Sequence, residues 1–176
     1  MTASRPPAAT RKANPMGYTN HCYRVLVFDR KKYRAAVSDL KKILPETGVD
    51  LAGCDGTGRP TVNDNDVCFN GRYPQHCETF SMPRVFDGRA RPRTLPGFTF
   101  SKTHRLPYDL AVKVSLLVFK RHFSDEVEIG SDDQDLLAGW SAAIELTHLV
   151  LDYPKAWSVE EWTEDGLTHR HLVLAL

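Results

Sequence analysis

Three ionisable residues from distant parts of the chain have the types needed for joint chemistry: Glu78, Lys102 and Asp109. A lysine ammonium binds an anion such as a phosphate, and carboxylates orient hydroxyl groups or accept protons. Charge is costly to bury without a partner, so Lys102, at the junction of an apolar strand and an apolar helix, indicates a site. We therefore predict that the three side chains share one cavity. The structural alternatives are a cross-strand Glu78–Lys102 ion pair and helix capping by Asp109.

Three further residues complete the predicted ligand-binding set. Asn70 and Tyr108 are expected to add polar contacts to the same wall. Asp55 stands in the glycine-rich stretch 53–60, which predicts either a simple turn or the backbone-lined rim of a pocket. The full set is Asn70, Glu78, Lys102, Tyr108, Asp109 and Asp55.

Other motifs that carry known chemistry are incomplete. His76-Cys77-Glu78 matches half of a zinc deaminase signature, but the two cysteine ligands that should follow are missing. The glycines of 53–58 lack the Lys-Ser/Thr of a P-loop. The 4 cysteines include no C-x-x-C pair and fit no standard zinc template. We therefore assign no metal and no catalytic residue, and the sequence identifies no cofactor.

The elements that position the candidate residues follow from the apolar pattern. Helical spacing predicts helices over 30–44, 107–123 and 134–151. Because hairpins fill the middle of the chain and helices flank them, we predict an α+β fold with a largely antiparallel sheet covered on one face by two or three helices. Strands are predicted over 22–28, 49–53, 67–70, 77–82, 98–102, 126–130 and 171–176.

The length of 176 residues favours one folded domain. The first 16 residues are rich in Ala, Pro and Arg and lack acidic residues, which is typical of a disordered tail. We expect a single domain over 17–153. Residues 154–176 are expected to form a tail or a terminal strand.

The net charge of +1 gives no global attraction to nucleic acid or to a membrane. We therefore expect no membrane partner, and nucleic acid is not the partner we expect, although the charge does not exclude it. Charge is uneven locally: 84–105 holds 6 basic residues and 1 acidic residue, while 125–135 holds 6 acidic and no basic residues. Two solvated faces, or a basic loop that meets an anion, would explain this pattern. Without an apolar run of about 18 residues or a secretory signal, we expect a cytosolic protein with reduced thiols. A Cys68–Cys77 disulfide is the alternative for the cysteines.

Several short motifs occur together in one order. In that order they resemble a group of small uncharacterised proteins, encoded by bacteriophages and actinobacteria, that open with MGYT. The resemblance spans about 16–152 and implies a domain start near Met16 and a viral or mobile-element origin. It implies no activity or catalytic residue, and the basic stretch 85–97 and the segment 154–176 depart from the group. The motifs are MGYT at 16–19, FNG at 69–71, ETF at 78–80, KT at 102–103, PYD at 107–109 and SD at 131–132.

We predict a soluble domain that binds a small anionic, nucleotide-like ligand at the candidate residues. One alternative is a hydrolase or nuclease that uses Glu78 and Asp109, with or without a divalent metal. The other is a protein–protein adaptor that makes contact through 84–105 and through Trp157 and Trp162. The ligand, the oligomeric state and the host do not follow from the sequence.

Overall fold

The computed structural model describes residues 17–92, 94–164 and 167–175, so the predicted tail over 1–16 lies outside the described residues. The chain alternates strands and helices in the order expected for an α+β protein. The elements are β1 (Thr19–Arg24), α1 (Arg30–Ile43), β2 (Leu51–Ala52), β3 (Thr61–Val62), β4 (Val67–Gly71), β5 (Phe80–Ser81), β6 (Gly97–Lys102), α2 (Asp109–Phe123), β7 (Val127–Ser131), α3 (Leu136–Leu151), β8 (Trp157–Glu164) and β9 (Leu167–Leu174).

The strands form two antiparallel sheets. The larger has the order β6-β1-β7-β9-β8, and in it Thr19 pairs with Lys102 while His21 pairs with both Phe100 and Gly130. The smaller is built around β4, which pairs with β2, β3 and β5. The predicted α+β class with antiparallel pairing is confirmed.

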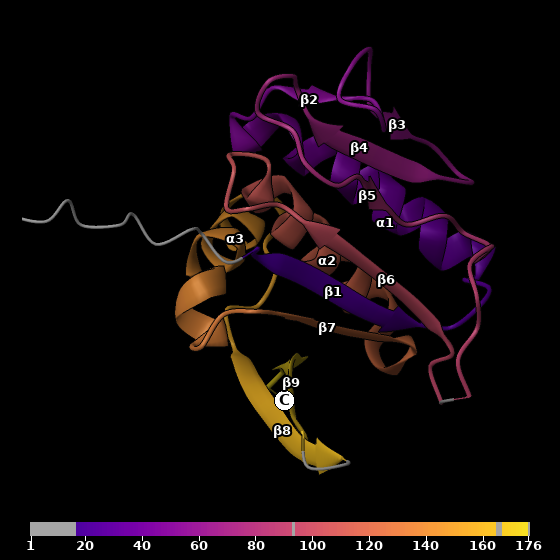
Figure 1. The fold of residues 1–176 in the computed structure, drawn as a ribbon, viewed down its shortest axis with the longest axis vertical. Helices are drawn as coiled ribbons and strands as arrows, with labels where there is room; N and C mark the ends of the chain where they lie inside the picture. The colour runs from indigo at the N-terminus through magenta and orange to yellow at the C-terminus, as the bar shows by residue number, and fades with distance from the viewer. Residues whose placement is uncertain (1–16, 93, 165–166, 176) are drawn as a thin grey trace, which may run out of the picture.

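In Figure 1, α1 lies behind β4 and α2 behind β6 and β1, while α3 lies beside them, and no described helix covers the face of the sheets toward the viewer. The central helix α2 is buried along nearly its whole length because apolar residues surround its axis. Helix α1 begins where predicted: the Asp29 carboxylate caps it by accepting from the Lys32 N–H at 2.9 Å. Within the described residues, no helix has the length and apolar character to cross a membrane.

Hydrogen bonds beside β5 join the two sheets along one line. The Glu78 N–H donates to the Lys102 carbonyl at 3.1 Å, and the Ser101 hydroxyl donates to the Glu78 carbonyl at 3.0 Å. Further along, the Thr99 hydroxyl donates to the Ser81 carbonyl at 3.3 Å. Glu78 therefore lies beside β6, as predicted, but just before β5 rather than inside a strand.

The prediction that all thiols are reduced is wrong in this structure. Cys54 and Cys68 form a disulfide, whereas Cys22 and Cys77 are free. The loop after β2 folds back over β4, where the Thr79 hydroxyl donates to the Cys54 carbonyl, and this brings the Cα atoms of Cys54 and Cys68 within 5.6 Å. Spacing along the chain could not show that contact.

The segment after α3 forms two antiparallel strands. Strands β8 and β9 pair along their whole length, and β9 joins the larger sheet through Ile129 and Leu172. Trp157 and Leu172 are buried, so these two strands contribute to the core. The predicted terminal strand is present, and β8 is an additional strand that the sequence pattern did not reveal.

Candidate functional site

The structure brings Glu78 and Lys102 together, but at the surface. The Glu78 carboxylate accepts from the Lys102 backbone N–H at 2.9 Å, and the Lys102 ammonium lies 4.0 Å away. Their side chains are 40% and 48% exposed. Alternation along β6 turns Ser101 inward and Lys102 outward, so the expectation of a charge held at a buried junction is wrong.

Asp109 is turned away from that pair. One carboxylate oxygen accepts from the Asn20 amide at 2.7 Å and from the Thr103 hydroxyl. The other lies 3.1 Å from the Lys113 ammonium, one helical turn further along α2. The predicted trio is therefore divided between an exposed pair and an internal network.

The internal network continues to Asp133, whose side chain is only 6% exposed. Lys113 lies 3.3 Å from the Asp133 carboxylate and donates to the Gly139 carbonyl at 2.7 Å. Tyr18 donates a hydrogen bond to Asp133, and Arg105 donates another at 3.0 Å. Each buried charge in this region therefore has an opposite charge and several hydrogen bonds, as a folded interior requires.

The pKa values of this network follow from its contacts. Burial alone would raise the pKa of Asp133, but the Tyr18 hydrogen bond, the Lys113 charge and the Ser131 and Arg105 hydrogen bonds outweigh it and hold the pKa below its ordinary value. Burial and the bond to Asp133 raise the pKa of Tyr18 far above its ordinary value. The network is therefore charged on Asp133 and neutral on Tyr18 at neutral pH.

The remaining predicted residues stabilise local structure. Asn70 is buried, and its amide bridges the Cys77 N–H and carbonyl. The Tyr108 hydroxyl lies 2.9 Å from the Glu78 carbonyl and 3.0 Å from the Lys102 carbonyl, in position to donate to either. The exposed Asp55 closes a turn by accepting two hydrogen bonds from Thr57, which lower its pKa.

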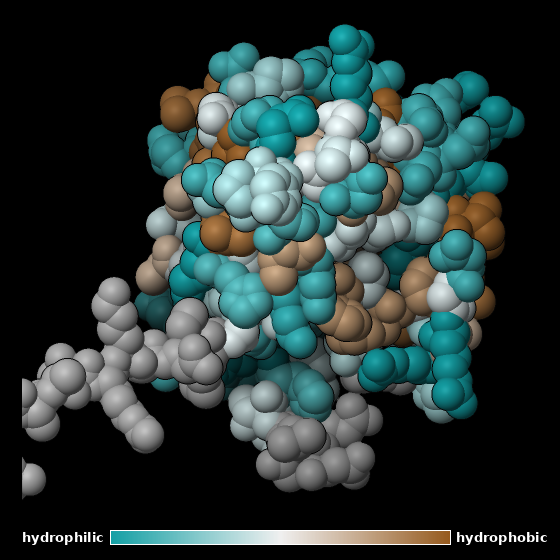
Figure 2. Space-filling model, turned by 45° about the horizontal axis from the view of Figure 1, so that its top comes forward, coloured by the Kyte–Doolittle hydropathy of each residue, from teal (hydrophilic) through white to brown (hydrophobic). Residues whose placement is uncertain are grey.

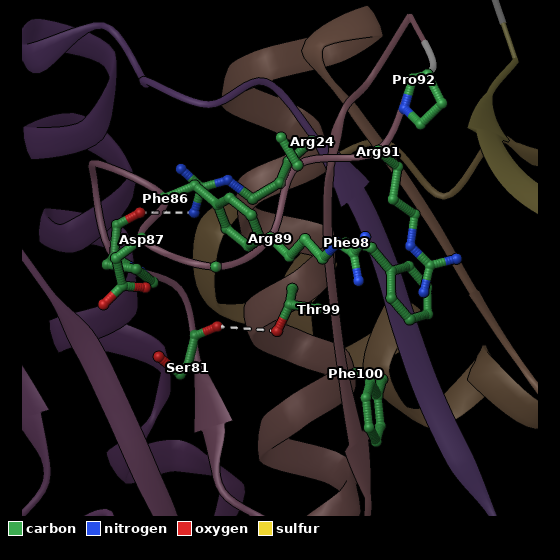
Figure 3. Close-up of a pocket in the computed structure, with 13 residues that line it drawn as sticks. Arg24, Ser81, Phe86, Asp87, Arg89, Arg91, Pro92, Phe98, Thr99 and Phe100 are labelled. Atoms are coloured by element: carbon green, nitrogen blue, oxygen red, sulfur yellow. Dashed lines mark hydrogen bonds between the residues drawn. The ribbon is translucent and has the colours of Figure 1, made fainter.

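A different part of the molecule has the shape of a binding site. A hollow of about 610 Å3 lies between β6 and the loop that follows β5 (Figure 3). We call it the arginine hollow, because three of its lining residues are arginines and only one is acidic. None of the four hollows described here is lined by Glu78, Lys102 or Asp109. The arginine hollow is lined by Arg24, Ser81, Pro83, Phe86, Asp87, Gly88, Arg89, Ala90, Arg91, Pro92, Phe98, Thr99 and Phe100.

The loop side of the arginine hollow is held in place by backbone contacts. The Phe86 N–H donates to the Leu26 carbonyl at 2.7 Å, and the Arg91 N–H donates to the Pro96 carbonyl at the same distance. On the other side, the Arg91 guanidinium stacks over the Phe98 ring, 4.4 Å from its centroid. Figure 3 shows Arg89 and Arg91 reaching from the loop toward β6.

Arg24 supplies a buried positive charge at the base of the hollow. Its guanidinium stacks on Phe28 at 3.8 Å and donates to the carbonyls of Pro83 at 2.6 Å and Arg84 at 3.2 Å. Burial lowers the pKa of Arg24 to about 10, which leaves it protonated at neutral pH. Among the described residues no carboxylate lies within ion-pair distance of it. Arg24 is therefore held by hydrogen bonds to neutral groups, and Asp87, the acidic residue of the hollow, acts on its charge without forming an ion pair.

Sequence reasoning noted the basic stretch 84–105 and predicted a strand over 98–102, but it did not join the two observations. Arg24 was missed because it stands in an apolar strand. The available signal was a charged residue within the buried pattern of CYRVLVF.

No group of three or more His, Cys, Asp or Glu residues suited to a metal ion occurs in the part of the chain that the structure describes. Comparisons with protein-family models, curated proteins and solved structures find no match to this chain. A function must therefore be argued from the geometry.

Proposed function

We propose that this protein binds a small anionic ligand of nucleotide type, and that the arginine hollow is the binding site. The observation that supports the proposal is the excess of arginines over carboxylates in this hollow, next to the Phe98 and Phe100 rings. An anionic phosphate is attracted by Arg89 and Arg91 and by the field of the buried Arg24. A planar base stacks against Phe98 or Phe100.

The size and charge of the hollow fit this class of ligand. Its volume of about 610 Å3 lies within the usual range of small-molecule sites. Asp87 reduces the positive potential but leaves the arginines in excess. This site replaces the residues predicted from the sequence as our preferred location, while the predicted class of ligand is kept.

The two alternative functions have weaker support. A hydrolase or nuclease would need Glu78 and Asp109 at one reacting centre, whereas each carboxylate has its own separate partners. An adaptor would use Trp157 and Trp162, but Trp157 is buried. On the side seen in Figure 2, hydrophobic side chains lie in small separate groups among hydrophilic ones. Both alternatives stay predictions, as do the viral origin and the cytosolic location.

Isothermal titration calorimetry with AMP, GMP, CMP, ADP and inorganic phosphate tests the proposal. We expect at least one nucleotide to bind more tightly than phosphate, because stacking adds to the ionic contact. The double variant Arg89→Ala/Arg91→Ala should weaken that binding by tenfold or more.

The matched control is Lys41→Ala, which removes a positive charge from the exposed side of α1, away from the hollow. It should leave the affinity unchanged. Absence of binding by every nucleotide to the folded protein, or equal losses in the double variant and the control, would contradict the proposal.

A further inference from the structure

Aromatic side chains continue across the open face of the larger sheet beyond the arginine hollow. On β6 the Phe98 and Phe100 rings lie 5.9 Å apart, and on β1 the Tyr23 ring lies 4.8 Å from Phe98. The His21 ring follows, 6.4 Å from Tyr23. Phe100 is 48% exposed, so this row is open to a ligand at its β6 end.

The row reaches β9 and β8. His169 on β9 faces the same hollow as His21, and Trp162 on β8 stacks on His169 at 5.1 Å with the rings 19° from parallel. Between β1 and β9 the chain places Gly130, where a Cβ would come within 2.8 Å of the His21 ring. Glycine thus leaves room for the imidazole to lie over β7. With strands about 4.8 Å apart, the row from β6 to β8 spans roughly 19 Å.

A second hollow of about 550 Å3 lies along this row. Phe98 and Phe100 line both hollows, so the two share an aromatic wall. The second hollow also contains Tyr23, His21 and His169. A single nucleotide occupies one hollow, whereas two stacked or splayed bases are needed to cover the whole row.

The two hollows differ in charge. Arginines dominate the first, while the second presents the exposed carboxylate of Asp132 and an arginine, Arg170, that is already paired with Glu161 at 2.6 Å. A phosphate therefore fits the first hollow, and the base edge of the next nucleotide fits the second. A carboxylate there accepts from an exocyclic amino group, such as that of cytosine.

We infer that the ligand is a stretch of single-stranded nucleic acid, at least two nucleotides long, that lies across the open sheet face. Aromatic rings on an open antiparallel sheet, next to a basic loop, form the type of surface on which unpaired bases stack. A duplex does not fit, because its bases are already stacked on one another. This inference rests on the proposed nucleotide binding in the arginine hollow and extends it by a second base.

The test compares dCMP, the dinucleotide and an oligodeoxycytidine of about eight nucleotides in calorimetric or anisotropy titrations of the full chain. We expect a tenfold or larger gain in affinity from the mononucleotide to the dinucleotide and a further gain for the oligonucleotide. A duplex of equal length should bind at least tenfold more weakly than the single strand.

The variant His169→Ala removes a ring that lines only the second hollow. It should reduce the ratio of oligonucleotide to mononucleotide affinity at least fivefold. Leu149→Ala, which truncates an exposed apolar side chain on α3, is the matched control and should leave the ratio unchanged.

The outcomes separate this inference from the function on which it rests. If dCMP binds but lengthening adds nothing, or if His169→Ala leaves the ratio unchanged, the single-strand inference is overturned while nucleotide binding stands. If neither the mononucleotide nor any longer probe binds, the proposed function itself is overturned.

Discussion

Two charged regions of this protein hold their charges in different environments. In the network of Tyr18, Asp109, Lys113 and Asp133, each charge is buried against an opposite charge and hydrogen-bonded. In the arginine hollow, Arg24 is buried without a carboxylate partner among the described residues, and Arg89 and Arg91 extend from an exposed loop.

This difference distinguishes charges that stabilise the fold from charges that are available to bind a ligand. A network whose charges cancel stabilises the fold and leaves nothing for a ligand to neutralise. Charges without a local partner keep their attraction for an external anion. Of the three residues at the centre of the sequence-based site, Asp109 lies in the network, whereas Glu78 and Lys102 form an exposed pair. Changes in the network should therefore alter stability, and changes in the hollow should alter binding.

The largest effect is expected for Lys113→Met. The side chain keeps its bulk but leaves Asp109 and Asp133 without their shared cation, and their side chains are only 14% and 6% exposed. Removing one partner of a buried ion pair costs about 3–5 kcal/mol. Urea denaturation should show this loss in the free energy of unfolding. A loss below about 1 kcal/mol would show that the network is not the stabilising region.

A smaller effect, with a distinctive pH dependence, is expected for Asp133→Asn. The variant weakens the acceptor for Tyr18, Ser131, Arg105 and Lys113 and should cost about 1–3 kcal/mol at pH 7. Because folding lowers the pKa of Asp133, its contribution is complete above the unfolded value of about 3.9 and is lost as the pH falls through the folded value.

The free energy of unfolding, measured from pH 7 to pH 3, should therefore show wild type and Asp133→Asn converging below about pH 4. Asp132→Asn is the control: its exposed side chain should change stability by no more than about 0.5 kcal/mol. Parallel pH profiles for wild type and Asp133→Asn would mean that Asp133 is not held charged by the fold.

Salt should distinguish the two regions directly. The Debye length falls from about 30 Å at 0.01 M to about 3 Å at 1 M salt, and exposed charges are screened far more than buried pairs. Nucleotide affinity in the arginine hollow should therefore fall severalfold over that range. The difference in unfolding free energy between wild type and Lys113→Met should stay nearly constant. If salt changed the nucleotide affinity and this difference in unfolding free energy equally, the charges of the two regions would not differ in their screening by solvent.

The sequence predicted the elements better than the contacts between them. Apolar periodicity placed α1 within one residue of its observed end, since the Asp29 cap and Pro45 are local signals. The strand predicted over 98–102 likewise matches β6 within one residue. The direction of the Asp109 carboxylate depends on Asn20 and Lys113, which only the folded sheet and helix bring together. The partner of Cys54 likewise depends on how a loop folds back.

The smallest effect is expected for Lys102→Met, and it decides between the site predicted from the sequence and the arginine hollow. Lys102 is half exposed and lies 4.0 Å from the Glu78 carboxylate, so its loss should cost no more than about 1 kcal/mol. Lys102 lines none of the hollows described here, so nucleotide affinity should stay within twofold of wild type. Calorimetric titrations of Lys102→Met and of Arg89→Ala/Arg91→Ala under the same conditions compare the changes in nucleotide affinity. A tenfold loss of affinity in Lys102→Met, with no loss in the double variant, would mean that the ligand binds at Glu78 and Lys102. An exposed lysine whose removal hardly changes stability can change the affinity that much only by contacting the ligand directly.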